Sequence, residues 1–311
     1  MLRLGLIGAG RWGRNFIKTI AALPGMRLAM LASRNPQSAA LVPAGCALAH
    51  EWRDLLEPGR VDALIVATPP ATHAEMVHAA VARGLPVLAE KPLTMSLREA
   101  TALRDFVAAQ AGFVMVDHTH LYSPAYHALK RSAPGCGAIT AIASRAGNMG
   151  PLRGDAPVLW DWGAHDVAFC LDLLGAGPDT VKASVIDSRA TPEGLGEVVE
   201  IRAAFPGPVP AVLTFGNLLP KTRRLTVHLE RATLVYDDLA ADKLVRYPSC
   251  EPFTQPRAPG EPIFTEPRMP LACAVAEFAT AVEAGSRSMR DLDLAVEVVR
   301  VLAGCEPLPA R

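Results

Sequence analysis

Short apolar runs alternate with stretches of helical spacing over the first 118 residues. Strands are predicted at residues 2–7, 26–32, 61–67, 87–89 and 112–116. Helices are predicted between them, at residues 15–20, 72–83 and 96–110. Because strands and helices take turns, the pattern favours a parallel sheet with helices on both faces. The first half therefore predicts a doubly wound α/β domain over residues 1–120, which binds ligands at the carboxyl ends of its strands.

The pattern changes after residue 120, where longer strand-like runs take over. Strands are predicted at residues 138–145, 179–188, 197–205, 209–216 and 223–230, with two shorter ones between 231 and 246. Residues 224–230 alternate cleanly, which predicts a sheet with one buried face and one face toward solvent or a partner. Helices are predicted at about residues 124–130, 271–284 and 292–302, the last two after a proline-rich loop. We expect this half to form a second α/β domain over residues 121–311.

Length and composition limit the classes of protein that fit. The chain of 311 residues is long enough for two domains. Lys plus Arg and Asp plus Glu both number 31, so no overall field favours nucleic acid or an anionic membrane. No apolar run approaches the roughly 18 residues of a membrane span, and the first run is too short for a signal peptide. The six scattered cysteines lack C-x-x-C spacing and are expected to be buried free thiols of a reducing compartment, so we expect a cytoplasmic protein.

A glycine-rich turn joins the first predicted strand to the first helix. Gly8, Gly10 and Gly13 form the spacing G-x-G-x-x-G at that point. Gly8 permits a tight turn, Gly10 lets the backbone approach a pyrophosphate, and Gly13 allows close packing of the helix. The phosphates would lie at the helix N-terminus, where unpaired N–H groups favour negative charge. We therefore predict a dinucleotide site here and assign Arg11 and Trp12 to it with the three glycines.

The end of the second predicted strand bears on the choice of dinucleotide. An acidic residue there accepts a hydrogen bond from the ribose of NAD, whereas an arginine accommodates the 2′-phosphate of NADP. The chain has Ser33 and Arg34 at this place and no Asp or Glu before Glu51. We therefore prefer NADP, with Ser33 and Arg34 on the phosphate and Arg11 covering it. The alternative is a solvated Arg34 and less selective binding of NAD.

Two further motifs follow predicted strands of the first domain. Residues 67–73, which include Thr68, Pro69 and His73, form a turn after the third strand, and Glu90-Lys91-Pro92 follows the next. Because the carboxyl ends of parallel strands lie on one edge of a sheet, these motifs and the glycine turn are expected on the same rim. Their shared position is stronger evidence for a ligand site than any single motif.

Together these motifs resemble the glucose-fructose oxidoreductase / inositol dehydrogenase / rhizopine catabolism (Gfo/Idh/MocA) family of NAD(P)-dependent oxidoreductases. The order and spacing of the three motifs carry the resemblance, and the Glu-Lys-Pro triplet is the most specific of them. The family implies an N-terminal Rossmann domain and a C-terminal α/β domain with a large, open and mainly antiparallel sheet. On this basis we assign Thr68, Pro69, His73, Glu90 and Lys91 to the cofactor site. The open sheet predicts a homodimer or homotetramer.

The resemblance also assigns the chemistry. Asp161 and His165 match the family's Asp-x-x-x-His catalytic signature, and Lys91 matches the lysine of its Glu-Lys-Pro. In the family these three residues converge beside the nicotinamide ring. A histidine suits proton exchange with a carbinol oxygen at neutral pH, and an ammonium stabilises developing alkoxide charge. We assign His165 as general acid/base, Lys91 as electrostatic or proton-relay group, and Asp161 as orienting carboxylate.

Simpler roles stay open for several residues. Asp161 would also suit a helix cap, and His165 would suit ordinary core packing. The two lie four residues apart, on one face of a helix, but no third metal ligand is evident and no metal is expected. Two interpretations stay open for His118 and His120, as cleft or strand-end residues, and for Trp160 and Trp162, as sugar-stacking or core residues. Pro92 is expected to matter through its fixed backbone, for which a cis bond is one option.

Two segments depart from the family pattern. The glycine pair that usually precedes the catalytic aspartate is replaced by residues 155–158, and residues 117–122 differ from the basic and aromatic run of many sugar-handling members. These changes affect the expected substrate more than the hydride chemistry.

The sequence therefore predicts an NADP-preferring oxidoreductase that interconverts a carbinol and a carbonyl on a sugar, cyclitol or similar polar metabolite. An NAD-dependent glycosidase of the same fold and a non-catalytic nucleotide-sensing regulator are the alternatives. Retention of Lys91, Asp161 and His165 argues against a regulator. The lack of an acidic residue after the second strand weakens the glycosidase hypothesis, because such an enzyme keeps its cofactor bound as NAD.

Overall fold

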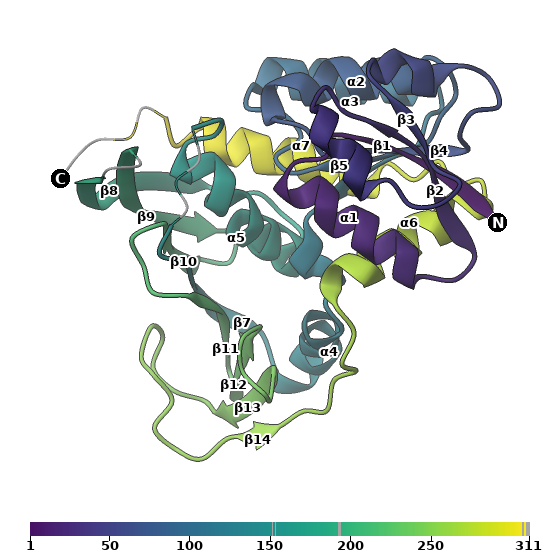
Figure 1. Cartoon of the computed structure of the whole chain (residues 1–311). Coiled ribbons are helices and arrows are strands. Elements are labelled where there is room, and N and C mark those ends of the chain that lie inside the picture. The colour runs from purple at the N-terminus through teal and green to yellow at the C-terminus, as the bar shows by residue number, and fades with distance from the viewer. Residues whose placement is uncertain (151, 153, 192–193, 307, 309–311) are drawn as a thin grey trace. The chain divides into compact units, whose positions relative to one another are not determined.

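The computed structural model describes residues 1–150, 152, 154–191, 194–306 and 308, and the chain divides into two compact units (Figure 1). The first unit contains residues 1–119 and 269–299, and the second contains residues 120–268 and those from 300 onward. One division between the units lies between residues 119 and 120, and the segment 269–299 belongs to the first unit.

A six-stranded parallel sheet is the core of the first unit. Its strand order is β3-β2-β1-β4-β5-β6. The strands are β1 (Leu2–Ile7), β2 (Met26–Ala32), β3 (Ala47–Ala49), β4 (Ala63–Val66), β5 (Val87–Glu90) and β6 (Val114–Asp117). Every residue of β4, β5 and β6 is buried, as expected for parallel strands that are covered on both faces. The prediction of a doubly wound parallel sheet is confirmed.

Helices cover both faces of this sheet. They are α1 (Arg11–Ala22), α2 (His73–Val81), α3 (Leu97–Ala109), α6 (Pro270–Glu283) and α7 (Arg290–Ala303), of which the last belongs to this unit as far as residue 299. α1 packs beside α6 and α2 beside α3, and Figure 1 shows these two pairs on opposite sides of the strands. α3 begins where its sequence predicts, because Ser96 is the N-cap and its hydroxyl accepts a hydrogen bond from Glu99 N at 3.4 Å.

Short 3₁₀ turns connect several of these elements. They are η1 (Pro36–Leu41), η2 (Trp52–Leu56), η3 (Pro70–Thr72), η4 (Thr119–Tyr122) and η5 (Ala133–Cys136). η3 follows β4 and η4 follows β6, so both lie at the carboxyl ends of strands.

An eight-stranded, mainly antiparallel sheet is the core of the second unit. Its strand order is β14-β13-β12-β11-β7-β10-β9-β8, and β7 and β10 are parallel neighbours. The strands are β7 (Ile139–Gly147), β8 (Thr180–Thr191), β9 (Gly194–Phe205), β10 (Val209–Gly216), β11 (Thr222–Leu229), β12 (Ala232–Asp237), β13 (Leu244–Pro248) and β14 (Glu261–Pro262). The mainly antiparallel sheet implied by the family resemblance is therefore present.

Two helices pack on this second sheet. α5 (Val158–Leu174) lies against β7, β9 and β10, and α4 (Pro124–Ser132) against β12 and β13. α5 approaches the sheet closely at Gly163, where an added Cβ would lie 2.8 Å from the ring of Phe215. The helix ends at Gly175, which has a φ of 68° and so suits the left-handed C-terminal position.

One prediction for this sheet is wrong. The alternation at residues 224–230 predicts a second face toward solvent or a partner, but β11 is buried continuously from Leu225 to Leu229. The loop after β13 covers the polar face, where Phe253 N donates to His228 Nε2 at 3.2 Å and Cys250 Sγ lies 3.8 Å from His228 Nδ1. The polar residues of this face therefore meet a loop instead of solvent.

All six cysteines are free thiols, as predicted, but only three of them are buried. In the parts of the chain that the structure describes, no helix is long and apolar enough to cross a membrane.

Candidate active site

The glycine turn between β1 and α1 has the geometry of a phosphate cradle. Gly8 has a φ of 102°, and an added Cβ there would lie 2.5 Å from the carbonyl oxygen of Ala67. A Cβ at Gly13 would collide with the Gly8 carbonyl, whereas the space around a Cβ at Gly10 is open to 4 Å. α1 starts at Arg11, so the unpaired N–H groups of its first turn lie next to this opening. The turn therefore has both the room and the donors for an anion.

The end of β2 carries an exposed cation. Arg34 is 74% exposed, and its Nη2 atom lies 3.9 Å from Glu51 Oε2. Both partners are in water, so this pair is weak. Ser33 Oγ lies 2.8 Å from Ser38 Oγ and accepts a hydrogen bond from Asn35 N at 3.2 Å. Glu51 comes here through β3, a strand of three residues that the sequence pattern did not predict.

His73 is fully buried and links two of the predicted motifs. Its Nδ1 atom lies 3.0 Å from the Pro92 carbonyl oxygen, and its Nε2 atom lies 2.8 Å from the Thr68 carbonyl oxygen. The imidazole thereby ties the turn after β4 to the segment after β5, where the Lys91–Pro92 bond is cis. His73 therefore connects two of the segments that the sequence assigns to the cofactor site.

Lys91 is buried among ionisable side chains at the ends of β5 and β6. The exposed fraction is 6% for Lys91, 4% for Glu90, 2% for His118 and 0% for Asp117. Glu90 and Asp117 are register partners on the two strands. Burial raises the pKa of Asp117 to about 7, although Thr119 and the charge of Lys91 oppose this rise. Burial, aided by Lys91, lowers the pKa of His118 to about 3, so His118 is neutral at physiological pH.

Asp161 and His165 lie one turn apart on α5, as their spacing predicts. The N-cap of α5 is Pro157, so Asp161 lies inside the first turn and is not the cap. The His165 ring lies 5.0 Å from the ring of His120, with 69° between their planes. His165 therefore belongs to a polar cluster. Within the described part of the chain, no three His, Cys, Asp or Glu side chains are arranged to hold a metal ion.

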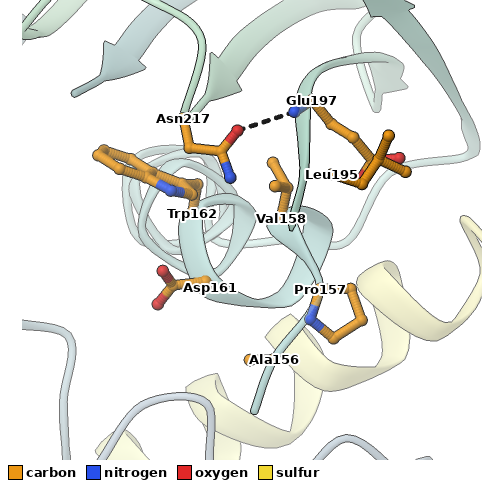
Figure 2. Close-up of a pocket in the computed structure, with 8 residues that line it drawn as sticks. All are labelled: Ala156, Pro157, Val158, Asp161, Trp162, Leu195, Glu197 and Asn217. Atoms are coloured by element: carbon orange, nitrogen blue, oxygen red, sulfur yellow. Dashed lines mark hydrogen bonds between the residues drawn. The ribbon is translucent and has the colours of Figure 1, made fainter. Parts of the chain in front are cut away.

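The two tryptophans beside Asp161 have different surroundings. Trp160 is buried, and its Nε1 atom donates to Glu306 Oε1 at 2.7 Å, which identifies it as a core residue. Trp162 lines a small open pocket of about 80 Å³ together with Asp161 (Figure 2). The complete lining is Ala156, Pro157, Val158, Asp161, Trp162, Leu195, Glu197 and Asn217.

This pocket has the chemistry of a site for a hydroxyl-rich ligand. Asn217 Oδ1 accepts a hydrogen bond from Glu197 N at 2.8 Å, so its amide group is held in one orientation with its NH₂ left as a donor. Figure 2 shows Asp161 and Trp162 on the helix below it and Glu197 on the neighbouring strand. Two carboxylates, an amide and an indole surface are groups that bind hydroxyls and C–H faces of sugars. No sequence motif marked Glu197 or Asn217, because they come together only through the pairing of β9 with β10.

Arg223 is a further polar residue that the sequence did not single out. Its Nη1 atom donates to His120 Nε2 at 3.1 Å, next to the pair formed by His120 and His165. Its charge also acts on Asp166, a buried residue of α5. Burial raises the pKa of Asp166 to about 7, and the neighbouring Ser144 hydroxyl and Arg223 oppose this rise.

Comparison with known proteins places these features in a family. Residues 2–118 match an oxidoreductase family model with an NAD-binding Rossmann fold. Inositol 2-dehydrogenase 4 from Saccharopolyspora erythraea is 34% identical over 136 residues, which are 42% of this chain and 40% of that protein. UDP-N-acetylglucosamine 3-dehydrogenase from Acidithiobacillus ferrooxidans is 32% identical over 185 residues, 58% and 57% of the two chains. The chain thus matches less than two thirds of the length of these curated relatives.

A solved structure extends the similarity to the whole chain. The crystal structure of a protein from Magnetospirillum magnetotacticum MS-1 is 46% identical, with a TM-score of 0.93, over 98% of this chain and 99% of that one. The similarity covers both units. The chain belongs to the Gfo/Idh/MocA family of oxidoreductases.

Proposed function

We propose that this protein is an NAD(P)-dependent oxidoreductase that transfers a hydride between a nicotinamide cofactor and a carbinol or carbonyl of a sugar, cyclitol or related polar metabolite. The observation that carries the proposal is the carboxyl edge of the first sheet, where the open glycine turn and the buried Lys91 follow nearby strands. The curated relatives support a hydroxylated substrate, because two of them are named as dehydrogenases of inositol and of UDP-N-acetylglucosamine.

The first unit has the residues to hold the dinucleotide. The glycine turn fits the group, because a Cβ at Gly8 or Gly13 would fill space that the backbone uses, whereas Gly10 leaves an opening. A bound nicotinamide would supply the hydride donor or acceptor. The residues proposed to hold the cofactor are Gly8, Gly10, Arg11, Trp12, Gly13, Ser33, Arg34, Thr68, Pro69, Glu90 and Lys91, with His73 beneath them.

Three residues are proposed to carry the reaction. His165 would exchange a proton with the substrate oxygen, a task that suits an imidazole at neutral pH. Lys91 would place its ammonium at the same oxygen and stabilise the negative charge that develops there. Asp161 would orient the substrate hydroxyl, which is consistent with its place in the pocket beside Trp162.

We propose NADP as the preferred cofactor. Arg34 supports this, because it is exposed and only weakly paired with Glu51. Titration with NADPH and then NADH, followed by nicotinamide fluorescence, tests the preference. Arg34→Ala should weaken NADPH binding by about 10-fold or more, the loss of a charge-assisted hydrogen bond, and leave NADH unchanged. Glu51→Gln is the matched variant and should tighten NADPH binding; an equal loss of both cofactors in Arg34→Ala would contradict the assignment.

The activity is tested by following nicotinamide absorbance with a panel of inositols, sugars and their keto derivatives. Turnover of a carbinol or carbonyl with free cofactor supports a reductase. Binding of neither cofactor, or hydrolysis of a glycoside without turnover of free cofactor, would refute it. Neither the family comparison nor a described residue favours the glycosidase or the regulator.

We also propose a division of labour and an assembly. The first unit would bind the cofactor, and the second would bind substrate and form a homodimer or homotetramer through its large sheet. The support is the width of the sheet, which has eight strands. A monomeric mass in light scattering would contradict the assembly.

A further inference from the structure

We propose that Arg223, held by His120, is an anion-binding position beside His165, and that the substrate therefore carries a carboxylate or a phosphate as well as the carbinol. This inference rests on the proposed function, because it names the substrate class of that site. It concerns residues of the second unit alone.

The geometry of three side chains supports this position. Arg223 Nη1 donates to His120 Nε2 at 3.1 Å, and the His120 ring lies 5.0 Å from the ring of His165. Because an arginine has donors only, Nε2 of His120 must accept, and a neutral His120 then carries its proton on Nδ1. His120 thus fixes the direction of the guanidinium without supplying a negative charge to cancel it.

The charge of Arg223 lacks a matching acid. Among the residues that the structure describes, no carboxylate lies within the 4.0 Å of an ion pair with its guanidinium. Asp238 forms its ion pair with Lys243 instead, with 3.3 Å between Asp238 Oδ1 and Lys243 Nζ. Asp166, the acid whose pKa Arg223 lowers, is buried and has a pKa of about 7, so it is ionised only in part at neutral pH. A half-buried guanidinium with four of its five N–H groups outside the bond to His120 is a strong site for an incoming oxyanion.

The place of Arg223 on β11 also supports the proposed anion site. Leu225 is the register partner of Ser144, whose hydroxyl acts on Asp166 of α5, so the Leu225 side chain lies on the sheet face that carries α5. Because side chains alternate along a strand, Arg223 lies on the same face. Arg224 lies on the other face, where its register partners are Asp237 on β12 and Arg145 on β7. Two adjacent arginines of the same strand therefore have different roles, and Arg224 is a matched control.

The expected ligand group follows from the donor. A guanidinium offers a planar fork that matches two oxygens of a carboxylate or of a phosphate. A sugar acid, a hydroxy acid or a sugar phosphate would place such a group on Arg223 while its hydroxyl lies at His165. A neutral polyol has nothing that uses the charge.

The test uses three probes that share one polyol chain. D-glucitol is neutral, D-gluconate has a carboxylate at one end, and D-glucitol 6-phosphate has a phosphate at one end. Each is titrated by calorimetry into protein saturated with NADPH. We expect at least one anion to bind about 10-fold or more tightly than glucitol, as charge-assisted hydrogen bonds imply. Whichever anion binds tighter identifies the group as carboxylate or phosphate.

Variants decide whether Arg223 causes the preference. Arg223→Gln should abolish the preference for the anion and leave glucitol binding unchanged, Arg223→Lys should retain part of it, and Arg224→Gln should retain all of it. Equal binding of the three probes to the wild type, no binding of either anion, or equal losses in Arg223→Gln and Arg224→Gln would overturn the proposal. Circular dichroism checks that each variant is folded.

The same samples separate this proposal from the proposed function. Normal NADPH binding without a preference for the anion would refute the anion site alone. An anion preference that depends on Arg223 in a protein that binds neither NADPH nor NADH would refute the oxidoreductase and leave the anion site standing.

Discussion

Replacing Asp166 by asparagine is expected to make the stability of the protein less dependent on pH. Asp166 is 3% exposed on α5, and its Oδ2 atom has no hydrogen-bond partner among the described residues. Burial disfavours its charged form and raises its pKa to about 7, against the opposing effects of Ser144 and Arg223. Asparagine has nearly the same shape but no proton to lose.

The sign and size of the effect follow from proton linkage. The folded-state pKa lies above the ordinary value of 3.8, so the folded protein holds this proton more tightly than the unfolded chain. The contribution to stability is complete below about pH 4 and is lost as the pH rises toward 7. Each pH unit in that window corresponds to about 1.4 kcal/mol. From about pH 5.5 to 8.5, Asp166 should therefore lower the free energy of unfolding by about 2 kcal/mol.

Urea unfolding at both pH values, followed by tryptophan fluorescence, measures this difference. The free energy of unfolding of Asp166→Asn relative to wild type should rise by about 2 kcal/mol between the lower and the higher pH. Asp117 titrates in both proteins, so its effect cancels in the comparison. Asp242→Asn, at an exposed position, should show no such change. Parallel pH profiles of wild type and Asp166→Asn would refute the reasoning.

Three further outcomes are expected. Lys91→Ala and His165→Ala should each lower turnover by about 10²-fold, the usual effect of losing a positioned proton-transfer group, and fluorescence titrations should show NADPH affinity largely retained in Lys91→Ala and unchanged in His165→Ala; rates near wild type would remove these assignments. Gly13→Ala should abolish NADPH binding, because its methyl group meets the Gly8 carbonyl, and unaltered affinity would disprove the close packing. His73→Ala removes the ring that lies between the Pro92 and Thr68 carbonyls; a neutral imidazole donates to one of them, so one carbonyl is left unpaired at about 1–3 kcal/mol and thermal unfolding should shift down by a few degrees, whereas an unchanged midpoint would contradict this role of the ring.

Most of the first unit could be predicted from the sequence, because its strands are buried on both faces and appear as continuous apolar runs. The bounds of β2 match the prediction, and α3 begins after the cap that its sequence contains. β3 was missed, since three residues are too short to show a period. β11 has the predicted length but not the predicted exposure, because the covering loop is separated from it by two strands and a turn.

The sequence could predict the site residues that follow directly after strands. It could not predict residues that come together only through the pairing of strands. The motifs at Gly8 and Lys91 follow strands, and the ends of parallel strands meet whatever their order. Asp117 is different, because it lies beside Glu90 only through the pairing of β5 with β6. Arg223 reaches His120 over a separation of 103 residues, and nothing in the local sequence distinguishes it from Arg224.

The placement of buried polar groups bears on whether these sites are functional. Both ring nitrogens of His118 lack a hydrogen-bond partner among the described residues, and Asp117 and Ser144 make no hydrogen bond of good geometry with their neighbours Thr119 and Asp166. Each buried polar group without a good hydrogen bond lowers the free energy of unfolding by about 1–3 kcal/mol. The total free energy of unfolding of a typical domain is roughly 5–15 kcal/mol. Apolar residues would pack these positions more stably, so a purely structural role does not account for them. The groups lie at the end of β6, beside Lys91, and beneath α5, which carries His165. Buried ionisable groups whose pKa values are strongly shifted concentrate at functional sites, and here they adjoin the residues proposed to move the proton.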